Sequence, residues 1–495
     1  MVKFTTSIFF ILISHLLFAQ RTSFFEDSSY SINASWRKKV KQIIVQDPGA
    51  PVFPSRHPDA QWFPKAGLGL FMHWGIHSVA GLDPSWDMVF NRPWLKKESV
   101  NDRTYKYKQD RTHYYALAKE FNPTAYQPEQ WIMAAKKAGF AYAVLTTKHH
   151  DGYALWPSSY GNMNTKYFMG GKDLIKPFVD ACRRNKVKVG FYFSPRDWYY
   201  PGFPNPYLDR AYLKKNPGDP FPPFDFNYEG NVKVPLYDKL ENTRRFDDWY
   251  AYTLGQLTEL LTRYGKIDVL WFDGIEWSGI EDTYFNQTIA YIRKLQPGIV
   301  INPRWDRLPN VEQNGLKGDF ETIEANFIED KIKPHEWWEY CAIFNRGSWG
   351  YTFGEAMHPT SWLVKNWVKC LSKSGNFLGN VGPRPDGQMS QNYYNRLAEL
   401  QAWLKWHKES VENVKTPPIQ GLSSLLTTYK KGQYYFHAFP DDNEVVKLNT
   451  SKRPKKITLL YRNTKLKYSI QNEKILIRIP ASLRSGIDDV VRVTF

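Results

Sequence analysis

Short apolar runs that suit buried strands alternate with segments of helical spacing about eight times between residues 60 and 410. This alternation constrains the fold more than any other feature of the chain. It predicts a parallel sheet covered by helices, and the repeat number predicts a (β/α)8 TIM-like barrel. A doubly wound sheet is the alternative, but the chain has neither a glycine-rich phosphate loop nor a dinucleotide fingerprint.

The expected elements can be placed by residue number. Strands are expected within Ala66–Gly75, Ala141–Thr146, Val187–Ser194, Ile267–Gly274, Ile299–Asn302 and Phe377–Val381, with further strand ends at Gly318–Glu324 and Trp349–Tyr351. Helices are expected at Glu129–Gly139, Leu174–Asn185, Trp249–Tyr264, Thr283–Gln296, Ser361–Ser374 and Tyr393–Lys408. The segment 199–245 is rich in Pro, Tyr and charge, which is typical of a long loop over one end of a barrel.

The composition and the apolar pattern of the sequence change at both ends of this region. Residues 1–19 combine Lys3 with an apolar stretch and a small residue at Ala19, which predicts a secretory signal peptide and a secreted or periplasmic location. No cysteine lies nearby and no later run is long enough to span a bilayer, so no membrane anchor is expected. We therefore expect a lead-in segment at 20–60, a catalytic barrel at 61–412 and an antiparallel β-sandwich at 413–495.

Charge and cysteine content narrow the class of protein. The chain carries 66 Lys and Arg against 49 Asp and Glu, a formal net charge of +17. For an exported protein a nucleic-acid partner is not expected; an anionic glycan and a generally basic, solubilising surface both stay open. Only three cysteines occur, without a zinc-type spacing, so neither a disulfide framework nor a structural zinc site is expected.

Polar residues gather where the expected strands end, the position that faces the active-site mouth of a β/α barrel. They are His73, His149, His150, Asp197, Asp273, Arg304, Asp319, Glu321 and Glu324. The apolar run Val269–Phe272 delivers Asp273 and Gly274, a pair that could equally begin an ordinary turn. Because adjacent residues of a strand point to opposite faces, His149 and His150 are not expected to share a metal ion. Carboxylates, histidines, an arginine and tryptophans instead suit a monosaccharide pocket.

Six motifs in this order resemble the α-L-fucosidases of glycoside hydrolase family 29. They are G-L-G-L-F-M-H-W-G (67–75), E-F-N-P-T-A-Y-Q-P-E-Q-W (120–131), A-V-L-T-T-K-H-H-D-G-Y-A-L-W-P-S (143–158), G-F-Y-F-S-P-R-D-W (190–198), L-W-F-D-G (270–274) and S-G-N-F-L-G-N-V-G-P-R-P-D-G (374–387). The resemblance spans roughly residues 60–410 and implies a barrel followed by a β-sandwich. It departs at 84–88, where many relatives carry Glu-Trp-Tyr and this chain has Pro-Ser-Trp-Asp-Met.

The resemblance implies a retaining exo-hydrolase that removes terminal α-L-fucose from glycans, without a metal or organic cofactor. It implies Asp273 as nucleophile and Glu324 as acid/base, with Glu339 as the runner-up and Asp319 and Glu321 behind it. A retaining mechanism needs such a pair of carboxyl groups about 5–5.5 Å apart. The expected substrate-binding residues are His73, His149, His150, Tyr192, Trp271 and Arg304.

Two other functions stay open at this point. One is a non-catalytic fucose-binding protein, and the other is a glycosidase for a related sugar such as galactose. The presence of both carboxylates, Asp273 and Glu324, argues against a binder that has lost catalysis.

Overall fold

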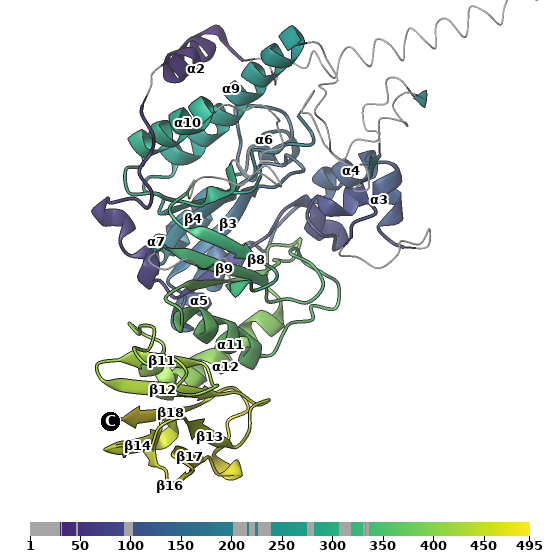
Figure 1. The fold of residues 1–495 in the computed structure, drawn as a ribbon. Helices are drawn as coiled ribbons and strands as arrows, with labels where there is room; N and C mark the ends of the chain where they lie inside the picture. The colour runs from purple at the N-terminus through teal and green to yellow at the C-terminus, as the bar shows by residue number, and fades with distance from the viewer. Residues whose placement is uncertain are drawn as a thin grey trace, which may run out of the picture.

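The computed structural model describes residues 30, 32–45, 48–93, 102–200, 215–216, 223–225, 239–274, 282–305, 318–329, 332 and 336–495. The predicted signal peptide and its cleavage site lie outside the described residues, as does most of the predicted loop at 199–245. Figure 1 shows a parallel sheet surrounded by helices, followed by antiparallel sheets that end in the C-terminus. Of the described helices, none is long and apolar enough to cross a membrane.

The main sheet has eight parallel strands in the order β7-β6-β4-β3-β1-β10-β9-β8. The strands are β1 (Leu68–Met72), β3 (Tyr142–Lys148), β4 (Lys188–Phe193), β6 (Val269–Phe272), β7 (Val300–Ile301), β8 (Glu321–Glu324), β9 (Trp338–Ile343) and β10 (Asn376–Val381). Most of their residues are buried, as expected for a parallel sheet that has helices outside it and side chains packed inside it. The predicted TIM-like barrel is confirmed as a curled eight-stranded sheet.

Asp319 joins the two ends of this sheet. Its backbone N–H donates to the carbonyl of Ile301 on β7 at 2.6 Å, two residues before β8 begins. Its carboxylate accepts from the backbone N–H of Ile301 at 2.7 Å and pairs with Arg293 at 2.7 Å. The short strands β7 and β8 are thus connected where they are not paired with each other.

Helices cover the outside of the sheet. They include α2 (Ala34–Val45), α5 (Pro128–Lys137), α7 (Ile175–Arg184), α9 (Lys239–Arg263), α10 (Asp282–Leu295), α11 (Thr360–Leu371) and α12 (Gln391–His407); α3 (Tyr105–Gln109), α4 (Thr112–Glu120) and α6 (Thr165–Phe168) follow strand ends. Local sequence explains their limits. Pro128 occupies the first turn of α5, and the Ser390 side chain caps α12 by accepting from the backbone N–H of Tyr393.

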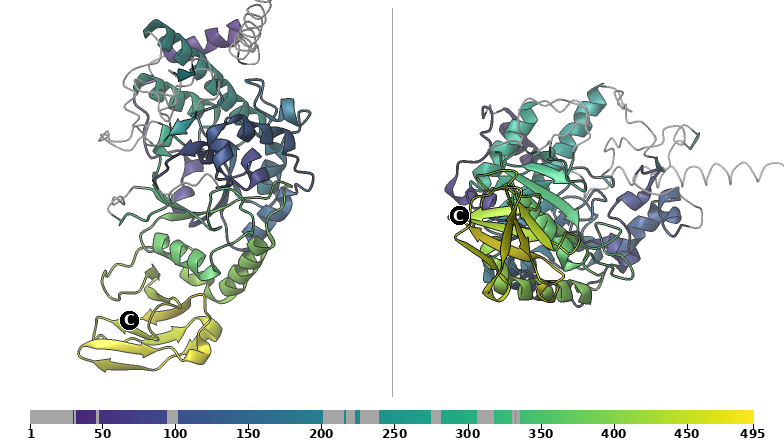
Figure 2. Two further views of the ribbon diagram at one scale, coloured as in Figure 1. Left: turned by 90° about the vertical axis from the view of Figure 1, so that its right-hand side faces the viewer. Right: turned by 60° about the horizontal axis from the view of Figure 1, so that its bottom comes forward.

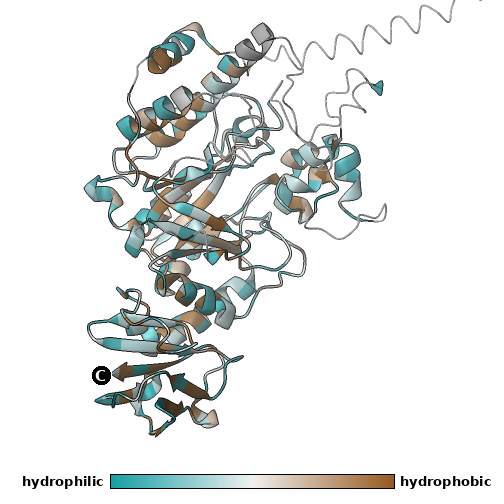
Figure 3. Cartoon of the chain, in the orientation of Figure 1, coloured by the Kyte–Doolittle hydropathy of each residue, from teal (hydrophilic) through white to brown (hydrophobic). Residues whose placement is uncertain are grey.

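The C-terminal domain is the predicted antiparallel β-sandwich. One sheet has the order β11-β12-β18-β14-β15 and the other β13-β17-β16. The strands are β11 (Thr427–Lys430), β12 (Gln433–Ala438), β13 (Val445–Leu448), β14 (Lys456–Leu459), β15 (Thr464–Lys465), β16 (Tyr468–Gln471), β17 (Lys474–Arg478) and β18 (Asp489–Thr494). Figure 2 shows the sandwich at one end of the molecule, and Figure 3 shows hydrophobic residues along β13, β17 and β18.

Two predicted elements of the barrel domain are wrong. The strand expected to end at Trp349–Tyr351 is β9, which ends at Ile343, and Trp349 lies in the loop that follows it. A glutamate inside the apolar run W-W-E-Y-C-A-I concealed this strand. Helix α9 begins at Lys239, ten residues before the predicted start at Trp249. The prediction missed its first turns because their sequence is charged and lacks the apolar period that marks a helix.

Candidate active site

A pocket opens among the C-terminal ends of the barrel strands. The lining residues are Phe71, His73, Pro84, Trp86, His149, Tyr192, Trp271, Asp273, Glu324 and Trp349. Five of the predicted strand-end or substrate-binding residues and Glu324 are therefore brought together in one place.

Asp273 follows β6 and is held by groups from two neighbouring segments. The Tyr192 hydroxyl, on β4, donates to Oδ2 at 2.7 Å, and Arg304 Nη2 lies 2.6 Å from Oδ1. His150 Nε2 lies 3.4 Å from Oδ2. Burial raises the pKa of Asp273, but the positive charges of Arg304 and Arg196 outweigh burial and leave the pKa below its ordinary value. This carboxyl is therefore ionised at neutral pH.

Arg304 contacts both carboxylates of the pocket. Its Nη2 pairs with Asp273 and its Nη1 with Glu324, the last residue of β8. The guanidinium also lies over the Trp271 ring, 5.0 Å from the ring centroid. One planar cation thus fixes the relative position of two carboxyl groups and packs against the pocket wall.

Each histidine that lines the pocket is oriented by a side chain bonded to its Nδ1 atom. His73 Nδ1 lies 2.7 Å from Asn380 Oδ1, and the Asn380 amide nitrogen donates to the carbonyl of Trp349. The Asn380 oxygen is therefore the acceptor, so His73 carries its proton on Nδ1 and leaves Nε2 as an acceptor. Burial lowers the pKa of His73 to about 4, so the ring is neutral at pH 7.

His149 is held by a residue at the point where the sequence departs from the family pattern. Ser85 Oγ accepts from the backbone N–H of Asp151 at 2.8 Å and lies 2.6 Å from His149 Nδ1. A hydroxyl has two acceptor lone pairs, so this bond holds the His149 ring in place in either imidazole tautomer. Burial lowers the pKa of His149 well below its ordinary value. The pocket thus contains two neutral imidazoles, each held at Nδ1 by a neighbouring side chain.

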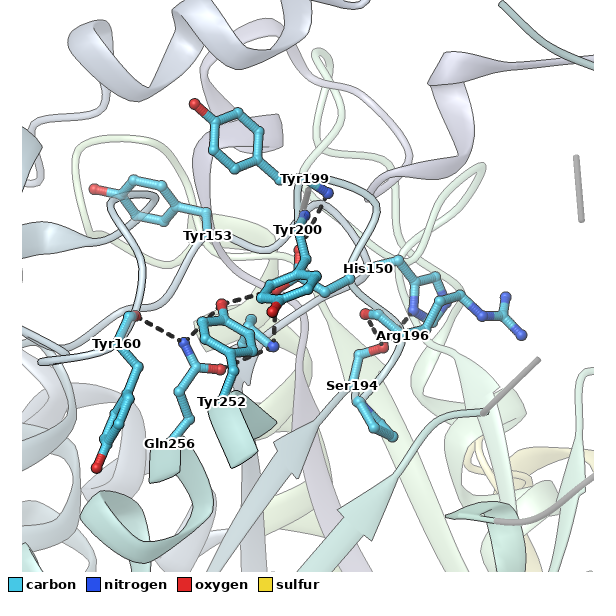
Figure 4. A network of polar contacts seen from close by, with 12 residues as sticks. His150, Tyr153, Tyr160, Ser194, Arg196, Tyr199, Tyr200, Tyr252 and Gln256 are labelled. Atoms are coloured by element: carbon cyan, nitrogen blue, oxygen red, sulfur yellow. Dashed lines mark hydrogen bonds and ion pairs between the residues drawn. The ribbon is translucent and has the colours of Figure 1, made fainter. Parts of the chain in front are cut away.

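A buried ion pair supports the turn that carries His150. Lys148 Nζ lies 3.0 Å from Asp197 Oδ2 and 2.9 Å from Gln256 Oε1, and the Tyr252 hydroxyl donates to the same Asp197 oxygen at 2.9 Å. Figure 4 shows Tyr252 and Gln256 at the centre of this network, with His150 and Ser194 beside it. Asp197, predicted at a strand end, therefore positions the loop and does not line the pocket.

Three other predicted carboxylates lie outside the pocket lining. Asp319 and Glu321 are at the amino end of β8, opposite the end that carries Glu324, and Asp319 is committed to Ile301 and Arg293. Glu339, the alternative acid/base, is the second residue of β9 and is completely buried. The Tyr142 hydroxyl and Trp271 Nε1 donate to its two oxygens. None of the three faces the pocket as Glu324 does.

The prediction that His149 and His150 point apart is wrong. Among the described residues, His149, His150 and Asp273 offer possible metal-ligand atoms that all lie within 4.8 Å of one another. Strand β3 ends at Lys148, so both histidines belong to the turn beyond it, where strand alternation does not apply. Arg304 already provides a cation on Asp273, and each histidine Nδ1 faces a serine hydroxyl, Ser85 or Ser194.

Sequence reasoning did not assign several residues of the pocket. Phe71 belongs to the interior of β1, and Pro84 and Trp86 lie on a loop that no strand-end rule covers; Trp349, expected at a strand end, lies on the loop after β9. Trp86 is a tryptophan in a polar loop segment, which is the one signal that could have found it. Nothing in the sequence indicated Phe71.

Comparisons with known proteins agree with this architecture. The family model described as Alpha-L-fucosidase matches residues 54–409. The chain is 28% identical to tissue alpha-L-fucosidase of Rattus norvegicus over 456 residues, which cover 88% of each chain. It is 27% identical to the Homo sapiens enzyme over 454 residues, 88% of this chain and 87% of that protein.

Solved structures show the same fold. Alpha-L-fucosidase isoenzyme 1 from Paenibacillus thiaminolyticus has a TM-score of 0.70 and 28% identity, covering 88% of this chain and 98% of its own. An alpha-L-fucosidase from Bacteroides thetaiotaomicron, solved as a trapped covalent intermediate, has a TM-score of 0.70 and 22% identity, covering 91% of this chain and 99% of its own.

Proposed function

The chain belongs to the alpha-L-fucosidase family of glycoside hydrolases, and we propose that it releases terminal α-L-fucose from glycans with retention of anomeric configuration. The observation that carries this proposal is the pair Asp273 and Glu324, which line one pocket and are joined by Arg304. Double displacement needs two carboxyl groups beside one anomeric carbon, and one guanidinium holds this pair at a single pocket.

Asp273 is the proposed nucleophile. Its ionised carboxylate would attack the anomeric carbon of fucose while the bond to the leaving oxygen breaks, which gives a covalent glycosyl-enzyme. Hydrogen bonding from Tyr192 and the charge of Arg304 keep this carboxyl ionised and fix its orientation. A covalent intermediate was trapped in the Bacteroides thetaiotaomicron neighbour, which is consistent with this step.

Glu324 is the proposed acid/base. It would donate a proton to the leaving oxygen in the first step and take one from the attacking water in the second. Its ion pair with Arg304 occupies a carboxyl oxygen, so this pair has to loosen for Glu324 to reach the leaving oxygen. Arg304 would then keep its contact with Asp273 and be free to bind a sugar hydroxyl.

Neutral imidazoles and aromatic rings are proposed to hold the sugar. His73 Nε2 would accept from one hydroxyl, and His149 Nε2 would form a hydrogen bond with another. Trp271, Trp86 and Trp349 supply apolar surface for the C–H face and the methyl group of fucose. His150 lies beside Asp273 and is proposed to line the same site from behind.

We also propose that the protein is exported and that residues 1–19 are removed as a signal peptide. The charged start and short apolar run of this segment support the proposal. The excess of positive charge supports an anionic, for example sulfated, fucosylated glycan as one natural substrate. Faster turnover of sulfated oligosaccharides at low salt than at high salt is expected, and equal rates at both would remove the anionic-substrate proposal.

The test of function compares nitrophenyl α-L-fucoside with the matching galactoside. We expect release of L-fucose, with the first product formed in the same anomeric configuration as the substrate by NMR. Incubation with 2-fluoro-fucosyl fluoride should add one sugar mass to the peptide that contains Asp273. Preferential release of galactose would show that fucose is not the preferred sugar. A first product of inverted configuration would contradict the role of Asp273 as nucleophile.

A further inference from the structure

Glu339 is a carboxyl group in the interior of the barrel. It is completely buried, and its β9 backbone pairs with Asn376 of β10 and Thr322 of β8. Its surroundings are a cluster of buried apolar and aromatic residues that includes Phe71, Tyr142 and Trp271. Burying a carboxyl group among such residues costs free energy unless its oxygens are hydrogen-bonded.

Both oxygens of Glu339 are bonded to aromatic side chains on other strands. The Tyr142 hydroxyl of β3 donates to Oε2, and Trp271 Nε1 of β6 donates to Oε1 at 3.0 Å. Burial raises the pKa of Glu339 to about 7. The carboxyl group therefore ties three strands together inside the barrel.

The bond to Trp271 reaches the active site directly. An indole has a single N–H donor, so the contact with Glu339 is the one directional bond that can fix the plane of this ring. The face of the ring lies parallel to Tyr192, with centroids 5.6 Å apart and an interplanar angle of 18°. Arg304 lies over the ring at 5.0 Å, and Phe71 packs against it at 5.1 Å.

Two of the neighbours of the Trp271 ring, Tyr192 and Arg304, also hold Asp273. Tyr192 donates to one oxygen of Asp273, and Arg304 pairs with the other. A rotation of the indole would therefore displace both contacts together. Misplacement of a reacting group by about 1 Å can reduce a rate about 100-fold.

We propose that Glu339 is a positioning residue, which fixes the plane of Trp271 and, through Tyr192 and Arg304, the orientation of Asp273. The inference rests on the proposed function of Asp273 as nucleophile. Glu339, which the sequence analysis gave as the alternative acid/base, thus has a role that does not involve proton transfer to substrate.

The test uses two substitutions of nearly the same size. Glu339→Gln keeps an acceptor for Trp271 Nε1–H and should retain kcat/KM within about threefold, because the bond that fixes the indole plane is preserved. Glu339→Met fills the same volume without an acceptor and should lower kcat/KM about 10–100-fold, with most of the loss in kcat. Unfolding midpoints measured for each variant separate loss of activity from loss of folding.

Two further variants locate the path of the effect. In a Trp271→Phe background, Glu339→Met should cost nothing more, because the bond it removes is already absent. Tyr142→Phe removes the other bond to Glu339 and should lower stability while it leaves kcat/KM within about threefold. If Glu339→Met is not recovered folded, Glu339→Asp replaces it, since a carboxyl group one methylene shorter cannot reach both rings.

Three results would overturn the inference. They are full kcat/KM in folded Glu339→Met or Glu339→Asp, an equal cost in the wild-type and Trp271→Phe backgrounds, and a loss in Glu339→Gln as large as in the Met variant. A wild-type chain that releases no fucose would instead overturn the proposed function. Hydrogen exchange of the Trp271 indole N–H, slow in wild type and Glu339→Gln and fast in Glu339→Met, then still tests the positioning role.

Discussion

Glu324 and Glu339 occupy adjacent parallel strands, yet their environments differ completely. Glu324 ends β8, has 36% of its side-chain surface exposed and meets Arg304 at the pocket mouth. Glu339 is near the start of β9, is fully buried and bonds to two aromatic rings. In a parallel barrel, the position of a residue along its strand decides whether it can reach substrate. The same side chain thus suits proton transfer at the rim and side-chain positioning in the interior.

The largest effect is expected at the rim, from Asp273→Asn. Loss of the nucleophilic carboxylate should lower kcat with an aryl α-L-fucoside on the order of 10³-fold or more, because the glycosyl-enzyme cannot form. Fucose binding, measured by calorimetry, should survive, since the amide has nearly the same shape. Substantial residual turnover by the purified variant would mean that another group is the nucleophile.

The second effect separates the two glutamates directly. Glu324→Ala should lower kcat/KM about 10²–10⁴-fold for a substrate with a poor leaving group, and far less for a nitrophenyl fucoside, because only poor leaving groups need the acid. Added azide should restore turnover and give fucosyl azide. Glu339→Met should show neither azide rescue nor dependence on the leaving group. If the Glu339 variant shows both and the Glu324 variant neither, the two roles are exchanged.

This contrast also shows what a sequence can and cannot predict. The alternation of strands and helices predicts the barrel, and strand ends predict His73, His149, Asp273 and Glu324, because their positions follow from local pattern and topology. The sequence cannot show which end of a short strand a carboxylate occupies. Asp319 was therefore expected near the substrate although it joins β7 to β8 on the other side.

Loops and buried polar groups are the other limit. Strand β9 is concealed by Glu339, because a charged residue in an apolar run usually argues against a buried strand. Only the fold supplies the Tyr142 and Trp271 donors that make this burial tolerable. Trp86 and Trp349 reach the pocket from loops, whose course depends on tertiary contacts and not on periodicity.

A smaller effect is expected from Tyr192→Phe, which leaves Asp273 in contact with Arg304 and His150. The hydroxyl orients one carboxylate oxygen, so its removal should lower kcat roughly 10-fold, comparable to one hydrogen bond to a charged group, while the stacking on Trp271 persists. Thr147→Val, a substitution on β3 that removes a hydroxyl bonded to the Tyr192 carbonyl, is the matched control and should leave kcat within about threefold. Equal losses in both variants would attribute the effect to general damage of β4.

The smallest expected change in activity, and the clearest pH signature, belongs to Glu339→Gln. Burial raises the pKa of Glu339 from its ordinary value to about 7, so between about pH 4.5 and 7 the folded protein holds a proton that the unfolded chain has released. Stability contributed by this group therefore falls as pH rises through that window, by up to roughly 3 kcal/mol at 1.36 kcal/mol per pKa unit.

The Gln variant cannot titrate, so its stability relative to wild type should improve from pH 5 to pH 8 in urea unfolding. The ionisable groups near Glu339 are Tyr142, Cys341 and Cys370, whose pKa values burial raises, so they stay neutral over this range. Burial raises the pKa of Asp83 and of Asp151 to about 6. Both groups titrate in the wild type and in the Gln variant, so their contributions cancel in the stability difference between the two proteins. If the stability difference between wild type and the Gln variant does not change with pH, Glu339 does not ionise near neutrality in the folded barrel.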